Sequence, residues 1–409
     1  MRSNTISLCL AALIAGHSGI VAAQGVTLRE ALDLALRRNP DILIAGSVVD
    51  SARSERRIAA ALPNPILSGN PNTPYQYAVS LPLDVTPNRF YRTRAAAVGL
   101  EAAAADRADV RRQITFAVAR AFFDVLLGQD KLRLSVERRE EVRRLLVADS
   151  VRVRTGDMPR HNLARTEVEM ARADAEVARG EVDLQVARLT LHGLIGAELA
   201  DTAKAVRGSL AYRRLDPLTD SLVAVALFRR PDFDASTQRV TQSVVAQRGV
   251  AARVFPTPVV SYVRQYTAPF ESGHFYSIGL SFELPSLNLY AGERARAAAS
   301  VDQAQMARRR VEVQLDRDVN TALAQFRIQR ALVERFESGL MGRVDESVEA
   351  TRYAYAHGAS SLLDLLDAMR SQRDVRMDYY TALHDYWTSV FGLNAAVGTD
   401  VFDVGEMLR

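Results

Sequence analysis

The sequence is poor in cysteine, lysine and long hydrophobic runs, and each shortage excludes a class of protein. Cys9 is the only cysteine in 409 residues. It lies in an N-terminal segment that we expect to be removed, so disulfides, cysteine-ligated metals and thiol catalysis are excluded. The only lysines are Lys131 and Lys204, and arginines alternate with acids throughout, which argues against nucleic-acid binding. Beyond the N-terminal segment, no stretch reaches the roughly 18 apolar residues of a membrane-spanning helix.

The first 23 residues have the pattern of a secretory signal peptide. Arg2 supplies a positive charge, residues 6–15 are mostly apolar, and small residues precede a cleavage site expected after Ala23. Cys9 lies inside the apolar part rather than after it, which is not the arrangement of a lipoprotein signal. We therefore expect residues 1–23 to be a signal peptide and the mature chain to act outside the cytoplasm.

The rest of the chain contains the same pattern twice, which predicts two structural repeats, residues 24–215 and 216–409. Short matching segments occur in the same order in both halves, and the offset between them drifts only slightly. Examples are Ala35-Leu36 with Ala226-Leu227, Pro40-Asp41 with Pro231-Asp232, Tyr77 with Tyr276, and Gly156 with Gly358. An irregular linker is expected over residues 197–217. The two repeats should form one intertwined domain, because each has the same long elements.

Each repeat is expected to hold two strands, a very long helix and a return helix. The first repeat places them at about 65–84, 88–154 and 160–196, and the second at about 257–284, 290–355 and 361–397. Apolar residues recur alternately four and three apart, as in Leu315, Val319, Ala322 and Phe326, which is the seam of a coiled coil. A helix over 88–154 would be roughly 100 Å long, so it needs partner helices along its whole length.

The strands alternate apolar and polar residues over a length that suits a tilted membrane-spanning strand. Tyr276, Ile278 and Leu280 share one face, and Ser277 and Gly279 share the other. Four strands cannot close a barrel, and an open edge in lipid would leave backbone groups unpaired. If these strands span a membrane, several chains must contribute to one barrel. An antiparallel sheet on a soluble core is the alternative.

The doubled order resembles the outer membrane efflux proteins, the TolC-like channel-tunnels. The residues that carry the resemblance are Thr27–Pro40 (TLREALDLALRRNP), Leu62–Pro65 (LPNP) and Tyr355–Asp367 (YAHGASSLLDLLD). The implied fold is mainly α with a small β part. In it, long α-hairpins form a periplasmic helical barrel, and two β-hairpins per chain contribute to a trimeric 12-stranded outer-membrane β-barrel. The implied partners are two further copies, a periplasmic adaptor, an inner-membrane transporter and outer-membrane lipid.

The resemblance also implies a function and a site. The function is a passive exit duct for small molecules or metal cations, with no catalysis, cofactor or bound metal; an exit duct for type I protein secretion is an alternative. A soluble periplasmic scaffold or adaptor is a further one. The glycine turns would form the periplasmic tip, with Tyr355 helping to hold it closed. The implied tip residues are Gly156, Gly358, Tyr355, Asp364, Asp367, Arg154, Asn162 and Ser360.

Two of these positions depart from the family pattern. Asn162 and Ser360 stand where the family can pair an acid with a basic residue, so that ion pair is absent. Arg154, Asp157 and Arg160 lie nearby and are the candidates for a substitute. Asp364 and Asp367 are three residues apart on one helix face, and a threefold axis would turn them into carboxylate rings that favour cations. The alternative is an ordinary first turn, where acids favour the positive end of the helix.

Overall fold

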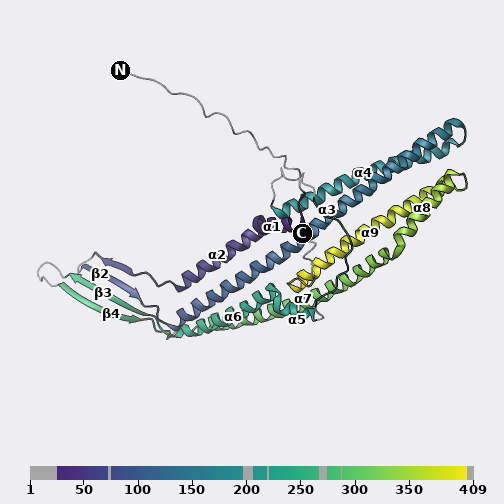
Figure 1. The fold of residues 1–409 in the computed structure, drawn as a ribbon. Coiled ribbons are helices and arrows are strands. Elements are labelled where there is room, and N and C mark those ends of the chain that lie inside the picture. The colour runs from purple at the N-terminus through teal and green to yellow at the C-terminus, as the bar shows by residue number, and fades with distance from the viewer. Residues whose placement is uncertain are drawn as a thin grey trace, which may run out of the picture.

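The computed structural model shows an elongated molecule with a small sheet at one end and long helices over the rest (Figure 1). It describes residues 25–71, 75–196, 206–218, 221–266, 274–286 and 288–402. The expected signal peptide, residues 1–23, lies outside these described residues. Among the described residues, no helix combines the length and the apolar character needed to cross a membrane.

Each repeat begins with a short helix followed by a medium one. Helix α1 (Leu28–Arg38) starts at a capping box, in which Thr27 and Glu30 bond each other's backbone N–H groups. Helix α2 (Pro40–Ala60) follows at once, because Asn39 ends α1 and caps α2 with its side chain. The second repeat has the same pair, α5 (Leu222–Arg229) and α6 (Pro231–Ala251), with a 3-10 turn over Ala252–Val254.

The long hairpins follow. In the first repeat, α3 (Pro87–Thr155) has 69 residues and returns as α4 (Arg160–Ile195). In the second repeat, α7 (Ala291–Arg335) and α8 (Met341–Ala356) are followed by the return helix α9 (Leu362–Val397). Figure 1 shows both hairpins running side by side and turning at the same end of the molecule, opposite the sheet. The expected seam residues Leu315, Val319 and Phe326 are buried.

The second long helix differs from the single helix expected over 290–355. A π-helical turn, Phe336–Leu340, separates α7 from α8, and within it Gly339 has a φ of 99°. This left-handed backbone is open to glycine but costly for residues with a Cβ. The apolar seam continues on both sides, with Val333 and Val348 buried, so the sequence pattern gave no sign of the break. Gly339 interrupts the helix without ending the hairpin.

The four strands form one antiparallel sheet in the order β1-β2-β3-β4. They are β1 (Ile66–Asn70), β2 (Tyr75–Pro82), β3 (Pro258–Tyr266) and β4 (His274–Phe282). The pairing puts Val79 opposite Tyr262, and Tyr262 opposite Ile278, so the apolar residues of the strands share one face. The other face is mixed: it carries serines, glutamines and small residues together with Val259, Val263 and Phe275. Strand β1 has only five residues and is followed by Pro71, which has no N–H to donate to a strand ladder.

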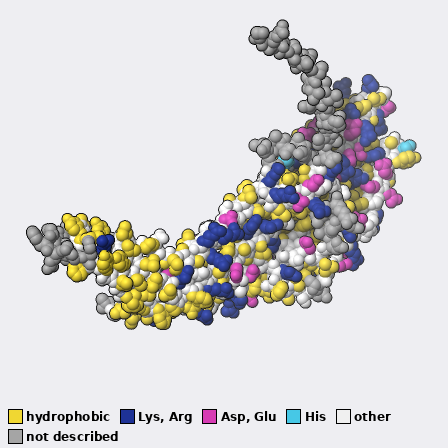
Figure 2. All heavy atoms as spheres, turned by 60° about the vertical axis from the view of Figure 1, so that its left-hand side comes forward, with side chains coloured by type: hydrophobic (Ala, Val, Ile, Leu, Met, Phe, Trp, Pro, Cys, Tyr) yellow, Lys and Arg dark blue, Asp and Glu magenta, His cyan; other side chains and the backbone are white. Residues whose placement is uncertain are grey.

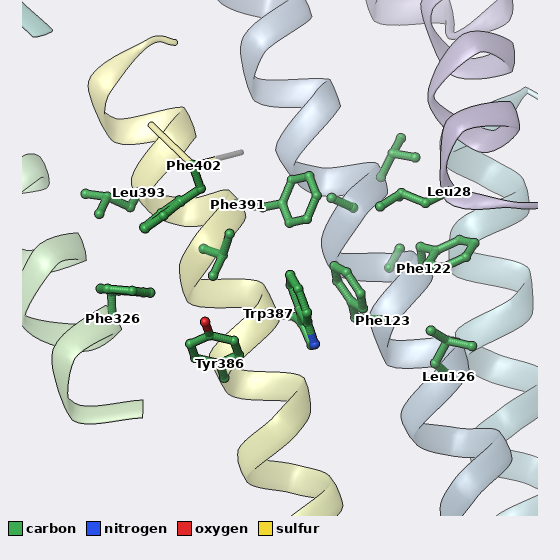
Figure 3. Packing of buried hydrophobic residues seen from close by; sticks show 14 of the residues in the cluster. Leu28, Phe122, Phe123, Leu126, Phe326, Tyr386, Trp387, Phe391, Leu393 and Phe402 are labelled. Carbon is green, nitrogen blue, oxygen red and sulfur yellow. The ribbon is translucent and has the colours of Figure 1, made fainter. Parts of the chain in front are cut away.

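The main apolar core lies midway along the molecule, where helices of both repeats meet (Figure 3). Phe123 of α3 stacks on Trp387 of α9 with ring centroids 6.1 Å apart. Phe326 of α7 packs against Tyr386 of α9 and against Phe402 near the end of the described chain. This core joins the two repeats, because its aromatic side chains come from helices of both.

The linker between the repeats is part of this core. The hydroxyl of Tyr386 donates a hydrogen bond to the backbone oxygen of Arg213 at 2.7 Å, and Nε1 of Trp387 donates to that of Ala211 at 3.0 Å. Leu210 of the linker is buried. The linker is therefore irregular backbone that α9 holds through two of its carbonyl groups, with Leu210 packed in the core.

A histidine joins α9 to α3 beside the core. Nε2 of His384 lies 2.7 Å from Asp124 of α3, and Nδ1 lies 2.9 Å from Asp385. Burial of His384 disfavours its charged form, but the hydrogen bonds with Asp124 and Asp385 outweigh that effect and raise the pKa of His384 to about 9. The imidazole is therefore charged at neutral pH and forms an ion pair between the helices.

Candidate functional site

The two glycine turns end the helical hairpins at the end of the molecule farthest from the sheet (Figure 1). Gly156 has a φ of 88° and Gly358 a φ of 76°. Gly156 caps α3 by donating its backbone N–H to carbonyls of the last turn, so the left-handed conformation is what reverses the chain there. The structure thus brings both sequence-predicted turns to the same end of one chain.

Tyr355 connects the second hairpin to the first. Its hydroxyl donates a hydrogen bond to Oδ1 of Asp149 at 2.8 Å, and Oδ2 of Asp149 accepts one from Thr166 of α4 at 2.7 Å. The guanidinium of Arg152 lies over the Tyr355 ring, 5.2 Å from its centroid. Burial and the bond to Asp149 raise the pKa of Tyr355. Three helices, α3, α4 and α8, are therefore joined through one carboxylate that is 0% exposed.

A second buried carboxylate joins the same hairpins farther from the turn. Glu169 of α4 is 4% exposed and accepts hydrogen bonds from Arg138 of α3, from Arg172 of its own helix and from Arg370 of α9. Several cations surround one acid, so its buried charge is compensated. Two more ion pairs join the hairpins, Arg352–Glu141 at 3.6 Å and Arg373–Glu176 at 3.2 Å.

The packing between the hairpins is incomplete beside Tyr355. A pocket of about 580 Å³ lies there, and its lining combines apolar and cationic side chains. Leu365 and Met369 of α9 and Arg152 of α3 line it, and so do the acids Glu141 and Asp149. Such a space is large enough for side chains to rearrange in. The hairpins are held together near the tip by these polar contacts and by a small apolar cluster beside the pocket, made of Val142, Val348, Leu365 and Met369.

The two predicted tip acids have different roles in the structure. Oδ2 of Asp364 accepts hydrogen bonds from the backbone and hydroxyl of Ser361 and from the hydroxyl of Ser360. These bonds hold the pKa of Asp364 below its usual value. Asp364 is therefore the third helical residue of a capping box in which Ser361 is the N-cap of α9. Asp367 is exposed, and the residues that the structure describes give it no hydrogen-bond or ion-pair partner.

Arg154 and Asn162 lie on either side of the first turn but do not reach the second. Arg154 is exposed in the last turn of α3, and the Asn162 backbone accepts a hydrogen bond from Thr166. The nearby Asp157 bonds Thr155 at 2.6 Å. Within the described part of this single chain, no basic residue near the first turn replaces the missing ion pair.

Sequence reasoning missed the buried acids Asp149 and Glu169, although a signal was present. Asp149 lies seven residues after the buried seam residue Val142, and Glu169 lies four residues before the buried Ala173. Both acids therefore occupy positions where the coiled-coil pattern expects apolar residues. A charged residue on such a seam indicates a partner across the helix interface.

Comparison with known proteins places this geometry in a family. The family described as "Outer membrane efflux protein" matches residues 31–197 and 222–399, which together cover most of the chain and both hairpins. The chain belongs to the outer membrane efflux protein family. The resemblance seen in the sequence is thereby confirmed, and so is its fold class of long helical hairpins with a small β part.

Individual members of the family are similar over most of their length. The cobalt-zinc-cadmium resistance protein CzcC of Cupriavidus metallidurans is 26% identical over 383 residues, covering 92% of this chain and 91% of CzcC. The outer membrane protein TolC of Vibrio cholerae is 25% identical over 320 residues, covering 71% of this chain and 70% of TolC. The crystal structure of the CmeC outer membrane channel of Campylobacter jejuni is similar in fold, with a TM-score of 0.80, 15% identity, and 93% and 89% coverage.

Proposed function

We propose that this outer membrane efflux protein is a passive exit duct that works as a homotrimer. The observation that carries the proposal is the four-stranded sheet with two unpaired edges, β1 and β4, and one continuous apolar face. Figure 2 shows hydrophobic side chains gathered over this end of the molecule. Unpaired strand edges are not tolerated in lipid, and three copies supply 12 strands, a number that suits a transmembrane barrel.

The helical part supports the same assembly. Exposed valines and a leucine follow the outer sides of α3 and α4, where the described chain offers them no cover: Val147, Val151, Val182, Val186 and Leu189. Apolar rows along long helices mark contacts with further helices. Neighbouring copies would cover them and close a helical barrel, which continues the strand barrel into the periplasm.

The cargo and partners follow from family membership and from the tip. CzcC is described as a cobalt-zinc-cadmium resistance protein, so metal cations and other small molecules are the proposed cargo. Three copies of Asp367 around an axis would favour cations. The chain has no energy-coupling motif in its sequence, so a periplasmic adaptor and an inner-membrane transporter are the proposed partners at the tip.

The hairpin contacts supply the gate. Tyr355 and Asp149 hold the second hairpin against the first, and the pocket beside them leaves room for movement. We propose that opening separates the hairpins and breaks this hydrogen bond. The closed arrangement is then the one described above, and its stability sets how rarely the duct opens without its partners.

Conductance of the purified protein in a planar bilayer tests the duct and its carboxylate ring together. We expect small, cation-selective conductance that loses selectivity in Asp367→Asn. Asp33→Asn is the matched control, because Asp33 is an exposed acid of α1, far from the tip. Asp364→Asn should also lower the stability of the tip, since the Asp364 carboxylate completes the capping box that begins at Ser361. Equal cation selectivity of Asp367→Asn and wild type would contradict the proposed ring of Asp367 carboxylates.

A further inference from the structure

One cation lies on the otherwise uncharged apolar face of the sheet. The cross-strand pairing puts Arg264 of β3 directly between Tyr77 of β2 and Tyr276 of β4. Toward the helices, the same face continues with Val79, Ile278 and Leu280. Among the strand residues that the structure describes, Arg264 is the only arginine, lysine or acid on this face. A charge on a face made for lipid is costly unless it has a partner.

Among the residues that the structure describes, aromatic rings rather than an acid contact the side chain of Arg264. Its guanidinium lies 4.9 Å from the ring centroid of Tyr266 and 5.8 Å from that of Tyr276. Tyr77 packs edge-on against Tyr266, with centroids 6.3 Å apart. Nε of Arg264 is buried and has no hydrogen-bond partner. The rings contact the guanidinium, and the described part of the chain supplies no acceptor for its Nε, which points to an oxygen-rich anion that comes from outside the chain.

Strand β3 begins beside the helices and leads away from them (Figure 1), and Arg264 lies near the far end of this strand. It is two residues before the end of β3 and six residues after its start at Pro258, a distance of roughly 20 Å along the strand. If the helices occupy the periplasm, Arg264 is close to the outer surface of the bilayer. Tyrosines favour this interface, and the lipid phosphates lie at the same level.

We propose that Arg264 and its tyrosines bind the phosphate of an anionic lipid in the outer leaflet. The planar guanidinium donates paired hydrogen bonds to phosphate oxygens. The tyrosine rings line the headgroup, and the acyl chains lie on the apolar residues between Arg264 and the helices. The site rests on the proposed membrane placement of the sheet, and it gives each copy one fixed lipid contact.

Lipid retention in native mass spectrometry tests the site. Protein in neutral detergent is incubated with phosphatidic acid, with diacylglycerol of the same chains, or with inorganic phosphate. Wild type should retain phosphatidic acid in preference to both others. Arg264→Met removes the charge yet keeps an apolar side chain that suits lipid, and it should bind phosphatidic acid about tenfold more weakly. Arg264→Lys should restore part of the binding.

The control is Arg310→Gln, which removes an exposed arginine of α7 far from the sheet; it should bind as wild type does. Equal retention by wild type and Arg264→Met would overturn the lipid site, and so would equal retention of diacylglycerol and phosphatidic acid. Conductance in neutral phosphatidylcholine separates this result from a failure of the proposed function. A protein that conducts but shows no lipid preference would support the proposed duct and contradict the lipid site. A protein that never inserts into the bilayer would contradict the duct itself.

Discussion

Tyr355→Phe is the change that isolates the proposed gate. It removes one hydroxyl, leaves the ring in its packing, and takes away one of the two hydrogen bonds that the buried Asp149 accepts from neighbouring side chains; Thr166 remains as the other donor. A hydrogen bond to a charged group contributes about 1.5–3 kcal/mol. A loss of about 2 kcal/mol shifts an equilibrium by a factor of roughly 30. The equilibrium constant that favours the closed over the open arrangement of each copy should fall by that factor.

Open probability in planar bilayers measures this shift. Tyr355→Phe should open more often than wild type, with unchanged conductance of the open state. Tyr353→Phe is the matched control, because Tyr353 lies in the same helix with an exposed side chain that stacks on His357. If both variants open as rarely as wild type, the bond between Tyr355 and Asp149 does not hold the tip closed, and the reasoning is refuted.

Three further predictions concern stability. Folding raises the pKa of His384 from about 6.5 to about 9. The ion pair of His384 therefore stabilises the fold fully below pH 6.5, and this stabilisation is lost as the pH rises to about 9. Across this pH window, the thermal midpoint of wild type should fall more than that of His384→Gln. Gly358→Ala should destabilise the tip by about 1 kcal/mol, since its φ is 76°, and hydrogen exchange near the turn should speed up. Phe123→Ala should cost about 3–5 kcal/mol of unfolding free energy in denaturant titration, because its side chain is fully buried; a cost below 1 kcal/mol would contradict the described core.

The periodic features of the fold could be predicted from the sequence, because they repeat. The seam through Leu315, Val319 and Phe326 follows the coiled-coil period, and these residues are buried. The alternation in β4 likewise predicted one apolar face. Gly339 could not be predicted to break the helix, because an isolated glycine is tolerated inside a helix and the seam continues past it.

The tip was predicted only in part, because its contacts are between residues distant in sequence. The turns at Gly156 and Gly358 are local features, and glycine marks them. The hydrogen bond between Tyr355 and Asp149 spans 206 positions, so no local pattern contains it. Asp364 could be recognised only as an acid near a helix start, and its bonds to Ser360 and Ser361 show that it is the acid of a capping box.

The state of the mature protein in the cell tests the central claim most directly. Membrane fractionation followed by mass determination in mild detergent should find the chain in the outer membrane as a trimer that dissociates on heating. Single chains released in soluble form when the cells are broken would contradict both the barrel and the duct.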